Sequence, residues 1–153
     1  MKLRIVAIAV CGAVCGARSA PAQTLAGCTL VKGYYRCNPV AFEKALKDAK
    51  TVVVQTQPFD RGATKALGDL IRALDKTETS GPADLTFLLI RPQAEGILYG
   101  PGDRELASLS VYSRGPQGAR GQLIWIESYR GQPDMAWAAV VHQLIAQFKA
   151  SIK

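Results

Sequence analysis

The spacing of apolar and polar residues divides the chain from residue 28 onward into short strands and helices. Residues 28–37 (CTLVKGYYRC) predict a hairpin that turns at Lys32-Gly33, because glycine readily adopts a positive φ. Asn38-Pro39 then predicts the start of a short helix, with Asn as the N-cap and Pro at the first helical position. Apolar residues recur at intervals of three and four from Phe42 to Ala49, which is typical of a helix with one buried face.

The rest of the chain predicts the elements of a core. Segments rich in β-branched or alternating apolar residues predict strands over 51–56, 84–90, 108–113 and 122–129. Apolar stripes predict helices over 60–74, capped by Asp60, and over 137–152. Segments 77–82, 93–103 and 115–121 have no apolar period and are expected to be loops.

The order β-α-β-β-β-α predicts an α+β fold. We expect a four-stranded, mostly antiparallel sheet with two helices on one face, preceded by a disulfide-closed hairpin and a short helix. The expected core comprises Leu85 or Leu88, Leu109, Val111, Ile124 or Trp125, packed against Leu67, Leu70, Leu144 and Phe148.

The first residues have the pattern of an export signal. Lys2 and Arg4 precede an apolar run over 5–17, which is too short to span a bilayer, and Ala20-Pro21-Ala22 is an A-x-A cleavage site. We therefore expect a signal peptide over 1–22 and a single domain over 23–153, exported to the periplasm or secreted. No transmembrane segment is expected in the mature chain.

A second processing signal competes with the first. Residues 25–28 (LAGC) spell a lipobox, which would place a lipid anchor on Cys28. Cys11 and Cys15 fall within the leader, so cleavage after Ala22 leaves Cys28 and Cys37 as an even pair in an oxidising compartment. A Cys28–Cys37 disulfide is favoured on this ground, and the lipid anchor at Cys28 stays as the alternative.

Composition narrows the range of functions. Removing Lys2, Arg4 and Arg18 lowers the net charge from +7 to +4, and the basic residues are scattered without interleaved aromatics, so no nucleic-acid partner is expected. One histidine and two paired cysteines do not supply a transition-metal site, and no cofactor motif is present.

Few side chains offer candidate chemistry. Asp103 and Glu105 could act as paired carboxylates, and the only histidine, His142, lies at the rim of an apolar stripe. Trp125 and Trp137 are expected in the core or at its rim, with ligand stacking as the alternative. Ile97, Leu98 and Tyr99 lie in a loop without a periodic pattern and form a candidate contact patch, the alternative being that Ile97 and Leu98 tuck under the sheet.

The runs ADLTFLLI and ASLSVYSRG…GQLIWIESYRG, followed by a long terminal helix, resemble exported bacterial domains of unknown function. These include small envelope lipoproteins and, more distantly, the periplasmic domains of the curli secretion channel and of the Tol system's B protein. Ala83-Asp84-Leu85 and residues 121–125 match the motifs of those domains over about residues 51–150, whereas the cysteine hairpin departs from them. The resemblance implies a role in envelope binding or assembly.

Together these features predict an exported, non-catalytic binding or assembly module of the bacterial cell envelope, with an envelope protein of unknown identity as partner. The alternative is a small exported hydrolase that uses Asp103 or Glu105.

Overall fold

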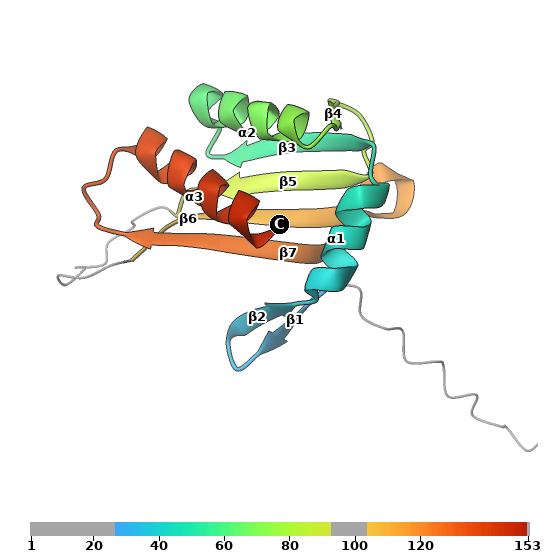
Figure 1. The fold of residues 1–153 in the computed structure, drawn as a ribbon, viewed down its shortest axis with the longest axis horizontal. Helices are drawn as coiled ribbons and strands as arrows, with labels where there is room; N and C mark the ends of the chain where they lie inside the picture. Colours follow the sequence, from blue (N-terminus) through green and yellow to red (C-terminus); the bar gives the residue numbers. More distant parts are fainter. Residues whose placement is uncertain (1–26, 93–103, 153) are drawn as a thin grey trace, which may run out of the picture.

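The computed structural model describes residues 27–92 and 104–152, and the predicted leader lies outside them. Two sheets and three helices make up this part of the chain (Figure 1). The small sheet contains β1 (Cys28–Val31) and β2 (Tyr34–Cys37). The large sheet contains β3 (Thr51–Gln57), β4 (Thr77–Glu78), β5 (Leu85–Ile90), β6 (Arg104–Arg114) and β7 (Arg120–Gly131). The helices are α1 (Pro39–Asp48), α2 (Arg61–Ala73) and α3 (Trp137–Ser151), and a 3₁₀ turn, η1 (Pro116–Gly118), joins β6 to β7.

The large sheet is mixed, so the expected four-stranded, mostly antiparallel sheet is wrong. Its strand order is β4-β3-β5-β6-β7. β3 pairs in parallel with β4 and with β5, whereas β5, β6 and β7 are antiparallel neighbours. The parallel pairing has a simple cause: α2 follows β3 and returns the chain to the end where β3 began, so the next strands run in the same direction.

The fifth strand comes from a segment that was expected to be a loop. β4 contains only Thr77 and Glu78, both exposed, and has no room for an alternating pattern. Its backbone nevertheless pairs with β3: the Thr77 amide donates to the Lys50 carbonyl and the Thr79 amide to the Val52 carbonyl, each at 2.9 Å. Tertiary contact with the edge of β3, not local sequence, makes this segment a strand.

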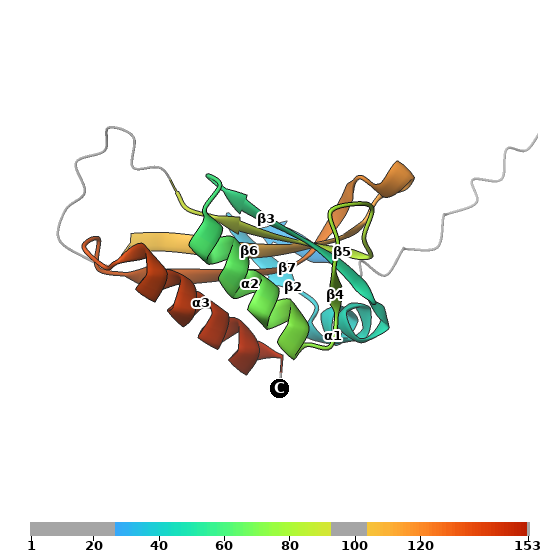
Figure 2. The same cartoon turned by 90° about the horizontal axis from the view of Figure 1, so that it is seen from above.

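The core lies between the large sheet and the helices. α2 and α3 lie side by side across one face of the sheet, with α1 at one end (Figure 2). Leu85, Phe87 and Leu89 of β5 point toward the helices, and Leu88 lies on the opposite face, outside the main apolar cluster. The buried residues that the helices contribute to this cluster are Phe42, Leu46, Ala63, Leu67, Leu70, Ile71, Val140, Val141, Leu144, Ile145 and Phe148.

The helix caps agree with the sequence. Asn38 accepts a hydrogen bond from the Ala41 amide at 3.2 Å, and Asp60 accepts one from the Ala63 amide at 2.7 Å. Each bond satisfies an amide that has no partner within its helix. Both helices therefore begin where the local sequence indicates.

Asp84 joins the starts of the two parallel strands β3 and β5. Its Oδ2 accepts from the amides of Lys50 and Thr51 at 2.9 and 3.0 Å and from the Thr51 hydroxyl at 3.0 Å. Hydrogen bonds from these amides hold the pKa of the Asp84 carboxyl below its usual range. The aspartate thus supports the parallel register of β3 against β5.

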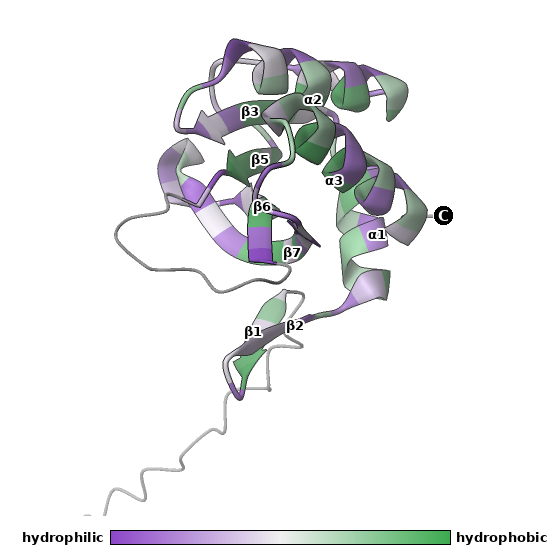
Figure 3. Cartoon of the chain, turned by 90° about the vertical axis from the view of Figure 1, so that its left-hand side faces the viewer, coloured by the Kyte–Doolittle hydropathy of each residue, from purple (hydrophilic) through white to green (hydrophobic). Residues whose placement is uncertain are grey.

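The N-terminal hairpin contains the expected disulfide. Cys28 and Cys37 are opposite one another in the β1–β2 register and are joined by an S–S bond. Lys32 and Gly33 form the turn, both with positive φ. The hairpin contacts β7 and extends away from the helices (Figure 3).

Among the described residues, no helix is both long and apolar enough to cross a membrane.

Candidate functional site

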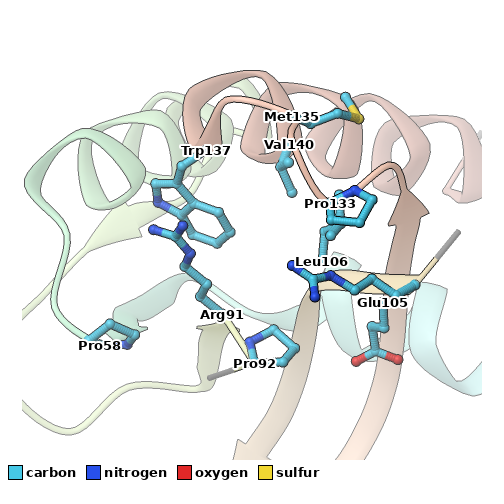
Figure 4. A pocket seen from close by; sticks show the side chains of 10 residues that line it. Pro58, Arg91, Pro92, Glu105, Leu106, Pro133, Met135, Trp137 and Val140 are labelled. Atoms are coloured by element: carbon cyan, nitrogen blue, oxygen red, sulfur yellow. The ribbon is translucent and has the colours of Figure 1, made fainter. Parts of the chain in front are cut away.

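A pocket lies where several element ends meet at one end of the large sheet. β3 and β5 finish there, and α2 and α3 begin there (Figures 1 and 2). The pocket has a volume of about 580 Å³, within the range of small-molecule sites. Pro58, Arg91, Pro92, Arg104, Glu105, Leu106, Pro133, Met135, Trp137 and Val140 line it (Figure 4). We call it the carboxyl-end pocket, because the carboxyl ends of parallel strands are where open α/β sheets bind their ligands.

Arg91 and Trp137 form the most specific feature of this pocket. Arg91 directly follows β5, and Trp137 is the first residue of α3. The Arg91 guanidinium lies 4.9 Å from the centre of the Trp137 ring (Figure 4). A guanidinium stacked on an aromatic face is held in one orientation while the N–H groups at its edge can still donate to a ligand.

Positive charge prevails over negative charge at the carboxyl-end pocket. Arg91 and Arg104 line it, and Glu105 is its only acidic lining residue. The N-cap of α3, Ala136, has no side chain that can accept from the first amides, and the first turn holds no acidic residue. The helix dipole therefore adds to the arginines and favours an anion at this end.

The remaining lining is apolar. Pro92, Leu106, Met135 and Val140 present carbon and sulfur, and the Tyr129 hydroxyl donates to the Met135 sulfur at 3.5 Å. A ligand with an acidic group on an apolar body matches this combination.

A second hollow of about 570 Å³ lies at the opposite end of the sheet and is lined in part by Gln55 and Arg120. There the Arg120 guanidinium donates to the Gln55 amide oxygen at 2.7 Å and lies 4.9 Å from the centre of the Tyr112 ring. This arginine serves contacts between β3, β6 and β7, so the second hollow is the weaker candidate.

The predicted acid–base residues do not come together. Glu105 lines the carboxyl-end pocket, but its side chain is exposed and its carboxylate points away from Arg91 and Trp137 (Figure 4). His142 lies in the grooves between α2 and α3, among residues such as Ala66 and Asp69. Asp103 and the contact patch Ile97, Leu98 and Tyr99 lie outside the described residues. Over 27–92 and 104–152, no group of three or more His, Cys, Asp or Glu side chains could hold a metal ion.

The two tryptophans have different roles. Trp125 stacks on Phe42 at 4.7 Å between ring centres and packs on the core, whereas Trp137 lines the pocket. Sequence reasoning did not single out Arg91, although its signal was present: Pro58 and Pro92 mark the ends of two strands. Those ends share an edge only if the strands are parallel, and the sheet was expected to be mostly antiparallel.

Comparisons with known proteins do not identify the chain. No known protein family matches it, and no curated protein matches it, so neither comparison supports the resemblance to the curli and Tol proteins. A solved structure that shares part of the fold is the PelC dodecamer from Paraburkholderia phytofirmans, with 13% identity and a TM-score of 0.41 over 68% of this chain and 88% of that chain. A likeness at this level gives no information about function.

Proposed function

We propose that this protein is an exported, non-catalytic binding module of the bacterial cell envelope, and that the carboxyl-end pocket is its ligand site. The export signal over 1–22 supports the location. The stack of Arg91 on Trp137 carries the assignment of the site, because it fixes a cationic donor over a partly apolar pocket. The ligand class is a carboxylate or similar anion attached to an apolar body.

The test compares two probes that differ only in charge. N-acetyl-leucine has a carboxylate on an apolar body, and its carboxamide is the neutral counterpart. Titration calorimetry should show tighter binding of the acid, and Arg91→Gln should weaken that binding about tenfold, the effect of losing one hydrogen bond to a charged group. Lys149→Gln removes one positive charge from the last turn of α3 and serves as the matched control.

Glu105 separates the binding module from the hydrolase alternative. Because Glu105 is the acidic residue at the pocket, Glu105→Gln should strengthen binding of the acid probe. A hydrolase that used Glu105 would instead lose turnover. Equal affinity for the acid and the amide, unaffected by Arg91→Gln, would refute the proposed site.

A further inference from the structure

The exposed large apolar side chains of this protein are concentrated on one small segment. Six such side chains are exposed among the described residues. Five of them, Leu30, Val31, Tyr34, Tyr35 and Val40, belong to the β1–β2 hairpin and the first turn of α1 that follows it. Tyr34 is 80% exposed and Leu30 63%. Residues of this size at the tip of a hairpin indicate a contact surface.

The hairpin is positioned to reach a surface that the body does not touch. It extends from β7 away from the helices, with hydrophobic stretches on its ribbon (Figure 3). Its disulfide closes the two strands at their base, and its turn lies at the far end. The crosslink holds together a two-stranded unit that would be marginal by itself.

Charge indicates the nature of the partner. Lys32 lies in the turn and Arg36 in β2, and no acidic residue occurs between Cys28 and Phe42. Tyrosine, with an apolar ring and a polar hydroxyl, is enriched at the boundary between lipid and water. Basic residues near an anionic bilayer are attracted to it, by roughly fivefold in affinity for each charge.

The geometry favours a fluid surface over a protein groove. Leu30 is paired with Tyr35 and Val31 with Tyr34, and consecutive residues of a strand point to opposite faces. Both faces of the hairpin tip are therefore apolar. A groove on a partner protein would cover one face, whereas lipid headgroups and upper acyl chains surround both.

From these observations we propose that the β1–β2 hairpin docks the protein onto an anionic phospholipid surface. Tyr34, Tyr35, Leu30 and Val31 enter the interfacial layer, and Lys32 and Arg36 bind lipid phosphates. Insertion is shallow, because the unpaired backbone groups at the hairpin edges must stay at headgroup depth. This surface is separate from the carboxyl-end pocket and does not depend on its ligand.

The experiment uses the protein recovered without detergent from the periplasm of an expressing bacterium. Co-sedimentation with vesicles of phosphatidylcholine containing about one-third phosphatidylglycerol should show binding, and vesicles of phosphatidylcholine alone much less. Leu30→Ser with Tyr34→Ser should abolish sedimentation without changing the melting temperature, because both side chains are exposed. Lys32→Gln with Arg36→Gln should weaken binding to anionic vesicles by roughly 25-fold, fivefold for each charge.

Phe59 provides the matched control, because it is also 80% exposed but precedes α2. Phe59→Ser and Arg91→Gln should leave vesicle binding unchanged, and the hairpin variants should leave probe binding at the pocket unchanged. The proposal is overturned if the protein does not bind anionic vesicles or if the hairpin variants bind as well as the parent. It is also overturned if sedimentation equilibrium without lipid shows a dimer that the hairpin variants abolish, since the surface then belongs to a second copy of the chain.

Discussion

Replacing Phe42 with alanine should strongly destabilise the fold. Phe42 is 1% exposed, stacks on Trp125 at 4.7 Å and meets Phe148 edge-to-face at 5.9 Å between ring centres. Loss of the buried ring removes about 1.5–3 kcal/mol of transfer free energy, and each aromatic pair adds about 0.5–1.5 kcal/mol. The total agrees with the roughly 3–5 kcal/mol usual for Phe→Ala in a core.

Urea denaturation followed by far-ultraviolet circular dichroism would measure this loss as a lower midpoint with an unchanged slope. Val40→Ala is the matched control, since Val40 is in the same helix but 74% exposed, and its effect should stay within about 0.5 kcal/mol. The comparison separates burial from helix propensity, because both variants place alanine in α1.

A Phe42→Ala loss below about 1 kcal/mol would refute the reasoning. Such a result would mean that α1 does not pack on Trp125 and Phe148 in solution. The hairpin, which α1 follows directly, would then lack a fixed position relative to the core.

Four further predictions follow from the fold. Asp84→Asn should cost about 1 kcal/mol at pH 7. The pKa of Asp84 is lowered in the fold, so its stabilisation is lost as pH falls through that lowered value, and urea denaturation in strong acid should show no difference between variant and parent. Burial raises the pKa of Glu127, so its ionisation reduces stability as pH rises, and the advantage of Glu127→Gln in thermal melts should grow from pH 4 to pH 7, whereas a pH-independent difference would contradict this. Leu144→Ala should cost about 2–5 kcal/mol in urea denaturation, and a loss below about 0.5 kcal/mol would place Leu144 on the surface. Mass spectrometry of the exported protein should give Gln23 as the first residue, and a diacylglyceryl adduct on Cys28 would instead favour the lipobox.

Local sequence patterns predicted the helices and most strands correctly. Asn38 and Asp60 cap helices where expected, and Lys32-Gly33 turns the hairpin. These features depend on residues within four positions of each other, so the chain specifies them without reference to the rest of the fold. The cysteine pair was predictable for a related reason, since a two-residue turn places Cys28 opposite Cys37.

Burial on the strands was only partly predictable. Alternation in β6 correctly placed Leu109 and Val111 toward the helices, but Ser110 is only 3% exposed although it faces the other side. In the sheet it lies between Leu88 of β5 and Ile126 of β7, and these larger neighbours shield it. Which residues flank a small side chain depends on strand order and register, and the sequence of one strand contains neither.

Two processing signals and one sheet show most clearly where the sequence reaches its limit. Residues 25–28 have the letters of a lipobox, but in the folded chain a Cβ on Gly27 would lie 2.6 Å from the Leu123 carbonyl oxygen, so this glycine allows the hairpin to approach β7. The carboxyl-end pocket is similar in origin: Pro58, Arg91, Leu106 and Trp137 come from four segments that meet only because β3 and β5 are parallel. Sequence alone determined the elements, their caps and the cysteine hairpin, since local backbone preferences and short-range hydrogen bonds specify these. The pairing of strands and the site at their ends were decided by tertiary structure, because they depend on how apolar faces distant in sequence are buried against each other.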